Sequence, residues 1–313
     1  MLSRTADHIY WLGRYVERAE TLARALDVQY RLSLLPQPAE SIAAGWMDTL
    51  DELGMLLEFR ERFGDVDAER PRQFVTFDRQ SLGSVYGCLR MARENARAVR
   101  GAITAEMWET MNATWLEVRS LSAQRREGDG FAEFIDWVKY RSQLFRGVLM
   151  STMLRDEGYS FMRMGMSLER ADGTARILGA RLASASGGTA TGGYYQWSVL
   201  LRAMSAFENY RKLFRDAVLP ERVAELLVLS EADPRSLRRA VDDLYANLRV
   251  VANHQSRETE RRTGELDAML RFGRADSLSV DRLRAYLDDC VDRLRDIDRR
   301  ISSDFLVAVE PVA

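Results

Sequence analysis

The chain has 313 residues, of which 46% are hydrophobic, and its 45 basic and 47 acidic side chains leave a formal net charge of −2. This composition predicts a globular protein with a sizeable core, and the lack of a basic surplus argues against nucleic-acid binding. Arg4 and Asp7 interrupt any signal-peptide core, and no uninterrupted run of about 18 apolar residues predicts a membrane span. Cys88 and Cys290 are too few for a disulfide framework or a thiolate metal cluster. We therefore expect a soluble, cytoplasmic protein that binds neither nucleic acid nor membrane.

Apolar residues recur with helical spacing along nearly the whole sequence, and no convincing period-two alternation predicts a strand. The six prolines fall between the periodic segments, where helices are expected to end. The predicted helices span residues 3–33, 42–63, 80–101, 104–126, 131–156, 159–184, 194–216, 221–229, 235–257, 259–272 and 279–307. The predicted fold class is therefore an all-α helical bundle.

Residues 9–26 and 161–178 resemble each other when the chain is shifted by 152 positions, with seven identities in eighteen positions. The identical pairs include Gly13 with Gly165, Glu17 with Glu169, Arg18 with Arg170 and Arg24 with Arg176. The same offset aligns Ser84 with Ser236 and Asn95 with Asn247. These matches predict an internal duplication into two pseudo-twofold-related repeats of five helices each, residues 1–157 and 158–313, packed as one body.

The repeated glycines and glutamates predict a tight helix crossing that holds a carboxylate. A glycine in the middle of a helix costs about 1 kcal/mol relative to alanine, so Gly13 and Gly165 indicate that another chain segment approaches closely there. Glu17 follows Gly13 by one turn, and a buried carboxylate needs a partner. The candidate partners of Glu17 are Arg14, Arg24 and the arginines of the predicted helix 80–101.

Two interpretations of the Glu-Arg residues remain open. The glutamates and arginines could form buried structural ion pairs that fix the register of a duplicated bundle. Alternatively, the pseudo-twofold could bring both copies together around a shared polar cleft that binds an anionic or peptide-like ligand. No metal or cofactor is expected, because His8 and His254 lie in no metal-binding pattern and no glycine-rich phosphate loop is present.

Three segments together resemble the bacterial alpha-E domain family over essentially the whole chain: LSRTADHIYWLGRYVERAETLARALDV, LGSVYGCLRMARENARAVRGAITAEMWETMN and GMSLERADGTARIL, with PRSL further on. The positions that carry the resemblance are Gly13, Arg14, Glu17, Arg18, Ala19, Arg24, Ala92, Arg93, Glu94, Asn95, Arg97, Arg100, Trp108, Asn112, Glu169, Arg170, Asp172, Arg176, Pro234, Arg235 and Ser236. Met166 stands where the first copy has Arg14, so any role of that arginine is not symmetric.

The resemblance implies a function in a peptide-synthesis or peptide-modification system, because genes of this family tend to accompany ATP-grasp proteins and transglutaminase-like proteins. We expect a non-catalytic accessory protein that binds one of these partners or their peptide product. The alternative is an enzyme of the same pathway that uses Glu17 or Glu169 as a general base in an arginine-lined cleft. The candidate polar network, with no catalytic residue assigned, comprises Arg14, Glu17, Arg18, Arg24, Arg93, Glu94, Asn95, Arg97, Glu169, Arg170 and Arg176.

Overall fold

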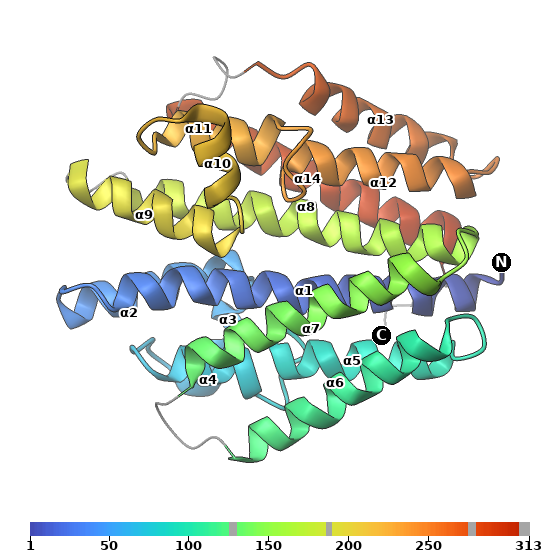
Figure 1. Ribbon diagram of the computed structural model, residues 1–313, viewed down its shortest axis with the longest axis horizontal. Coiled ribbons are helices and arrows are strands. Elements are labelled where there is room, and N and C mark those ends of the chain that lie inside the picture. The colour runs from blue at the N-terminus through green and yellow to red at the C-terminus, as the bar shows by residue number, and fades with distance from the viewer. Residues whose placement is uncertain (125–129, 186–189, 275–279, 307–313) are drawn as a thin grey trace.

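The computed structural model describes residues 1–124, 130–185, 190–274 and 280–306, and within these ranges all regular secondary structure is helical (Figure 1). The first seven helices are α1 (Ser3–Ser33), α2 (Ala39–Glu52), α3 (Leu56–Phe63), α4 (Arg70–Phe77), α5 (Val85–Ala98), α6 (Ala105–Gln124) and α7 (Phe131–Thr152). The next seven are α8 (Glu157–Ala185), α9 (Ala190–Ala203), α10 (Phe207–Phe214), α11 (Pro220–Ala224), α12 (Leu237–Val251), α13 (Arg257–Arg271) and α14 (Val280–Phe305). A π-helical turn, Glu225–Leu229, directly follows α11. The prediction of an all-α protein is confirmed for the described residues.

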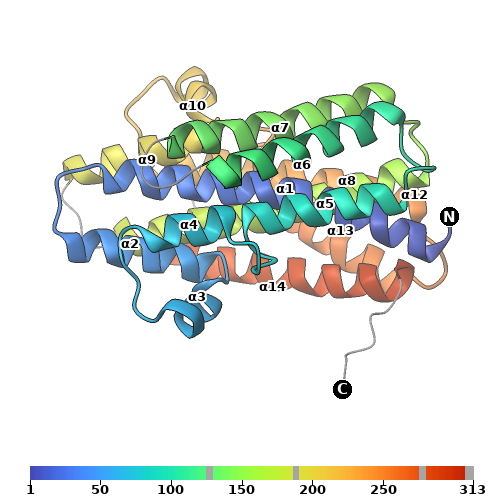
Figure 2. The ribbon, with the colours of Figure 1, turned by 90° about the horizontal axis from the view of Figure 1, so that it is seen from below.

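The long helices α1 and α8 run side by side through the middle of the molecule and make the most extensive helix–helix contact in it (Figures 1 and 2). Helices α5 and α7 pack on α1, whereas α12 and α14 pack on α8. This arrangement encloses α1 on all sides in its middle part: from Val16 to Gln29, every residue except Arg18 is buried. The buried charged residues of this stretch therefore need partners inside the protein.

Two predicted helices are each broken into two by a residue in the left-handed region of backbone space. Gly54, with φ of 68°, separates α2 from α3, and Ser205, with φ of 56°, lies between α9 and α10. A residue in this conformation ends an α-helix. The continuous helices predicted at 42–63 and 194–216 are therefore wrong.

Helix α4 was not predicted at all, and it begins with Pro71 in its first turn, where proline is tolerated. The prediction of five helices per half is consequently wrong as well: in the described residues, seven α-helices precede Glu157 and seven run from Glu157 onward. The predicted boundaries at residues 126, 279 and 307 lie outside the described residues.

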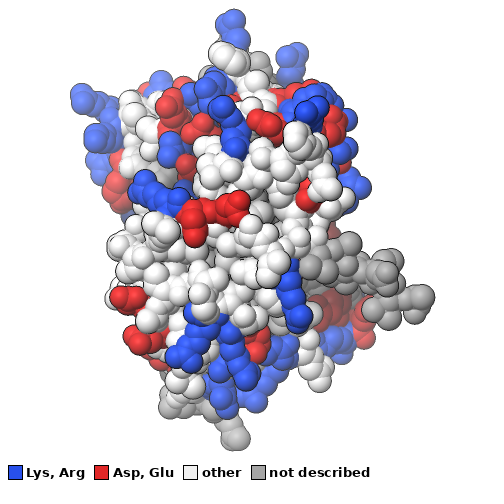
Figure 3. All heavy atoms as spheres, turned by 90° about the vertical axis from the view of Figure 1, so that its right-hand side faces the viewer, with Lys and Arg blue, Asp and Glu red and all other residues white. Residues whose placement is uncertain are grey.

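Figure 3 shows the end of the bundle where α1 begins and α7 gives way to α8. A largely uncharged band crosses this end, with side chains of both charges above and below it. The Met1 amino group pairs with Glu157 at 2.5 Å, and the large apolar residues Leu2, next to Met1, and Leu154, three residues before Glu157, are exposed. In the described ranges, no helix is both long enough and apolar enough to span a bilayer.

Candidate functional site

The crossing of α1 and α8 brings their backbones into direct contact at the two repeated glycines. A Cβ atom added to Gly13 would lie 2.5 Å from the carbonyl oxygen of Met162, which is too close for any side chain. A Cβ atom on Gly165 would collide in the same way with the carbonyl oxygen of Tyr10. The two contacts are equivalent under the offset of 152 residues, since Tyr10 and Met162 are also related by it. The close approach predicted from these glycines is therefore present, and it sets α1 against α8.

Glu169 of α8 is 5% exposed and accepts hydrogen bonds from two arginines of α1. Arg14 Nε lies 2.5 Å from its Oε2, and Arg18 donates from Nε and Nη2 to Oε1 and Oε2 at 2.6 and 3.0 Å. Arg14 also donates to Asp298 of α14 at 2.6 Å and to the Tyr10 hydroxyl at 3.1 Å. Two guanidinium groups thus donate three hydrogen bonds to this carboxylate from the opposite helix.

Glu17 of α1 is fully buried and receives the reciprocal contact from α8. Arg170 donates from Nε and Nη2 to the two Glu17 carboxylate oxygens at 2.9 and 2.8 Å, a bidentate geometry that matches a carboxylate well. Arg146 of α7 and Arg235, which lies just before α12, approach Glu17 at 3.7 and 3.6 Å. Both also pair with Glu20, one turn further along α1. Neighbouring residues on a helix do not face each other, so Glu17 and Arg18 cannot pair together. Both bind residues of α8 instead, and Glu169 and Arg170 bind residues of α1.

The ion-pair network continues along both helices by one more turn. Arg24 donates to Glu20 at 2.7 Å and to the carbonyl oxygen of Ala203. Arg176 donates to Asp172 at 2.7 Å and contacts the carbonyl oxygen of Glu52 at 3.4 Å. Each of these arginines thus ties a carboxylate on its own helix to the C-terminal end of α9 or α2.

The arginines keep the buried carboxylates ionised. Burial alone would raise the pKa of Glu17, but Arg146 and Arg170 hold that pKa well below its usual range. In the same way, burial opposes ionisation of Glu169, while Arg18 and Arg14 lower its pKa to about 2. Both groups therefore act as fixed negative charges at neutral pH.

The pKa of Glu169 predicts acid sensitivity of the fold. Because the folded value of about 2 lies below the ordinary value of 4.5, ionised Glu169 stabilises the fold fully above pH 4.5, and this contribution is lost as the pH falls towards 2. Urea unfolding followed by circular dichroism at several pH values should show a falling free energy of unfolding across this window. Glu169→Gln should show a shallower decline; equal slopes in the two proteins would contradict the prediction.

The α5 members of the predicted network, Arg93, Glu94, Asn95 and Arg97, lie away from this core. Arg93 pairs with Glu94 at 2.6 Å, and Arg97, which has a 66% exposed side chain, approaches the same carboxylate at 3.7 Å. The side chain of Asn95 lies 2.8 Å from the His8 ring nitrogen Nδ1 of α1. The arginines of α5 are thus not partners of Glu17. Arg14 and Arg24, the other predicted candidates, are not its partners either: Arg14 binds Glu169, and Arg24 binds Glu20.

Four residues that pair directly with members of this core were not in the predicted network: Glu20, Arg146, Arg235 and Asp298. Arg146 lies on α7 and Asp298 lies on α14 at matching positions under the 152-residue offset, but their charges are opposite. Identity between the copies therefore could not reveal them. Glu20 lies three residues after Glu17, a spacing that puts both on one face of α1.

A cavity of about 430 Å³ opens beside the Glu169 end of this network, between α1, α2 and α8. Its charged lining comprises Arg18, Glu52, Glu58, Glu169, Asp172, Arg176, Arg181 and Arg295. Within the described ranges, no group of three or more His, Cys, Asp or Glu side chains is placed to hold a metal ion.

These features define an all-helical protein whose two central helices are joined by buried, reciprocal Glu-Arg pairs. The chain belongs to the Alpha-E family, described as a predicted alpha-helical domain with a conserved ER motif, whose model matches residues 1–306. The resemblance seen in the sequence is thereby confirmed.

Known relatives of the chain include an uncharacterised protein of Mycobacterium bovis, 25% identical over 304 residues that cover 91% of this chain and 34% of the relative. An uncharacterised protein of Mycobacterium tuberculosis strain H37Rv is 24% identical over the same shares. The chain thus spans about a third of the length of these relatives. No solved structure matches it.

Proposed function

We propose that this chain is a non-catalytic helical accessory protein that works with an ATP-grasp ligase and a transglutaminase-like protein in a bacterial peptide-synthesis or peptide-modification system. The observation that carries the non-catalytic part is the pairing of Glu17 and Glu169 with arginines inside the protein. A general base needs a free lone pair and a pKa near the working pH. Glu169 has a pKa of about 2 and accepts three hydrogen bonds from two arginines, so it is a very weak proton acceptor at neutral pH.

The same observation favours the structural interpretation of the Glu-Arg residues. The pairs Arg18–Glu169 and Arg170–Glu17 exchange partners between α1 and α8, and they fix both the register and the direction of the crossing. A rigid centre of this kind suits a protein that presents surfaces to partners. It disfavours the alternative enzyme, whose base would have to leave its arginines during each reaction cycle.

We further infer that the two central helices descend from one duplicated unit, which makes residues 1–157 and 158–313 two pseudo-twofold-related halves of one body. Matched local details support this inference. At the start of α5, the Ser84 hydroxyl accepts a hydrogen bond from the Gly87 amide. At the start of α12, the Ser236 hydroxyl accepts one from the Arg239 amide in the same way. The left-handed residues Gly54 and Ser205 likewise interrupt the two halves at corresponding places, at an offset of 151.

The partner part of the proposal rests on the family resemblance. The mycobacterial relatives support it in that a segment similar to 91% of this chain forms about a third of each longer protein. A helical unit that functions beside other protein parts is consistent with that arrangement.

Reconstitution with purified proteins tests the proposal. The chain is mixed with the ATP-grasp protein and the transglutaminase-like protein of the same genome, separately and together, and analysed by size-exclusion chromatography with light scattering. We expect a stable complex with at least one of them, and no turnover of peptide or amide substrates by the chain alone. The absence of any complex would refute the accessory role. Turnover by the chain alone that Glu169→Gln abolishes, in a variant that remains folded, would establish the enzyme instead.

A further inference from the structure

The cavity beside Glu169 has the size and lining of a small-molecule site. Its volume of about 430 Å³ falls within the range of roughly 300–1,000 Å³ typical of ligand pockets. Along α8 it is lined from Glu169 to Arg181, a distance of about 18 Å at the rise of an α-helix. Leu22 and Val28 of α1, with Ile177 of α8, give it an apolar wall.

Arg181 lines this cavity as a buried arginine without a protein partner. It is 5% exposed, and among the described residues no carboxylate oxygen lies within 4.0 Å of it and no hydrogen bond from it is found. Burial lowers its pKa, and Asp48 and Glu52 oppose that effect only from a distance. The other arginines buried to this extent, in contrast, all bind carboxylates at short range: Arg14, Arg24, Arg170 and Arg235.

Other charged side chains that line the cavity already have ion-pair partners. Arg18 is bound to Glu169, and Arg176 is bound to Asp172 at 2.7 Å. Among the residues that the structure describes, Glu52 forms its ion pair with Arg284 of α14, at the long distance of 3.7 Å, and burial raises the pKa of Glu52. The interior therefore presents one unmatched positive charge next to a weakly paired carboxylate.

The wall of the cavity includes a glycine at a position where the other half of the chain has an arginine. Gly83 lies in its wall, and the residue 152 positions later is Arg235, whose guanidinium is buried against Glu20 and Glu17 in the other half. Under this offset, the buried Arg235 side chain stands where the cavity wall has a glycine. Arg181 has the neutral Gln29 as its counterpart at the same offset, so the unmatched charge occurs only on the side that carries the cavity.

We propose that this cavity binds a monocarboxylate, either a small organic acid or the C-terminus of a peptide, with Arg181 holding the carboxylate and the apolar wall holding an aliphatic side chain. A buried cation is costly without a partner, and the planar guanidinium fork matches a carboxylate with two parallel hydrogen bonds. Glu52 and Glu58 also line the cavity, and they would repel a doubly charged phosphate. The site stands on this geometry and does not depend on the partner proteins proposed above.

Titration with N-acetyl-L-leucine, followed by calorimetry and by NMR shifts of the labelled protein, tests the proposal. We expect saturable binding with a Kd on the order of 1 mM or below, and binding about tenfold or more weaker in Arg181→Met, the loss expected for a charge-assisted hydrogen bond. Arg299→Met removes an arginine with a 78% exposed side chain on α14, so it should bind as the unaltered protein does. N-acetyl-L-leucinamide, which lacks the carboxylate, should not bind.

Two further titrations, with a peptide and with phosphate, distinguish a small organic acid from a peptide C-terminus and test the preference for a carboxylate. A tetrapeptide ending in leucine that binds more tightly than N-acetyl-L-leucine identifies a peptide C-terminus, and weaker binding identifies a small acid. Inorganic phosphate that binds in preference to both acids would overturn the proposal. So would the absence of binding by both acids, or equal binding to the Arg181→Met protein.

The free protein gives an independent readout. If Arg181 has no partner without a ligand, Arg181→Met removes an uncompensated buried charge and should raise the unfolding temperature. N-acetyl-L-leucine should then stabilise the unaltered protein but not this variant. A clear fall in the unfolding temperature would show that Arg181 is a structural element of the empty protein, and it would overturn the proposal.

Discussion

Replacing Gly165 with alanine is expected to destabilise the protein, even though alanine forms helices better than glycine does. The added Cβ would collide with the backbone carbonyl oxygen of Tyr10, which cannot rotate away as a side chain would. Overpacking typically costs about 1–3 kcal/mol, against a gain of about 1 kcal/mol in helix propensity. Because a backbone must move here, we expect a net loss of about 2 kcal/mol or more in the free energy of unfolding, measured by urea denaturation.

Gly147→Ala provides the matched control, since Gly147 is an exposed glycine within α7 and nothing lies within 4 Å of an added Cβ there. That change should stabilise the protein by up to about 1 kcal/mol. Gly13→Ala should resemble Gly165→Ala, because the carbonyl of Met162 blocks it in the equivalent way. If Gly165→Ala stabilised the protein as Gly147→Ala does, the helices would not be in backbone contact at this crossing.

The sequence predicts the crossing well because its cause is local. An apolar arc with helical spacing and a costly glycine at the same place in both copies are properties of a single helix, and both can be recognised without knowing its neighbours. The break at Gly54 has a local signal too, since glycine often ends a helix, but the apolar pattern hid it; the break at Ser205 has no such signal. The apolar pattern continues past both positions, and serine carries no strong preference for the left-handed conformation that ends the helix there.

The partners of the charged residues could not be predicted to the same degree, because they lie on helices that are distant in the sequence. Arg14 is one turn from Glu17 yet binds Glu169, since the crossing brings that carboxylate nearer. The dense arginines of α5 suggested partners for Glu17, but Arg93 and Arg97 lie on a face where Glu94 neutralises them.

Glu17→Gln should be among the most damaging single substitutions in the chain. It keeps the size of the side chain but leaves the buried Arg170 facing a neutral group, with Arg146 and Arg235 close by. Removing one partner of a buried ion pair typically costs about 3–5 kcal/mol, because the remaining charge stays buried and uncompensated. We expect a loss of this size in the free energy of unfolding, measured by urea denaturation at pH 7.

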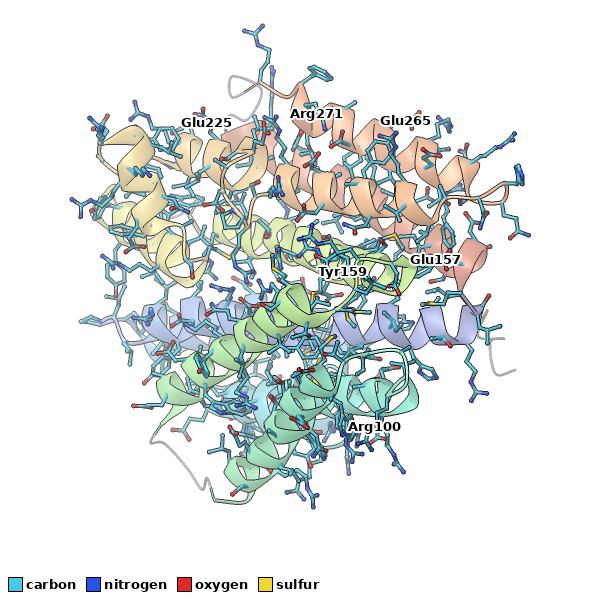
Figure 4. The ribbon with its side chains drawn as sticks, turned by 45° about the vertical axis from the view of Figure 1, so that its right-hand side comes forward. Arg100, Glu157, Tyr159, Glu225, Glu265 and Arg271 are labelled. Carbon is cyan, nitrogen blue, oxygen red and sulfur yellow. The ribbon has the colours of Figure 1, made fainter. Side chains whose placement is uncertain are left out.

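Glu265→Gln on α13 is the matched control. Figure 4 shows Glu265 and Arg271 on this outer helix, and the Glu265 side chain is 43% exposed and paired with Arg261. Exposed ion pairs contribute about 0–1 kcal/mol to stability, so this change should lower the free energy of unfolding by no more than that. The double substitution Glu17→Gln with Arg170→Met should cost less than the sum of the two single changes, because each single change leaves the other group without its partner. A Glu17→Gln protein as stable as Glu265→Gln would mean that water or a rearranged side chain reaches Arg170, and that the Glu-Arg pairs do not hold the two central helices together.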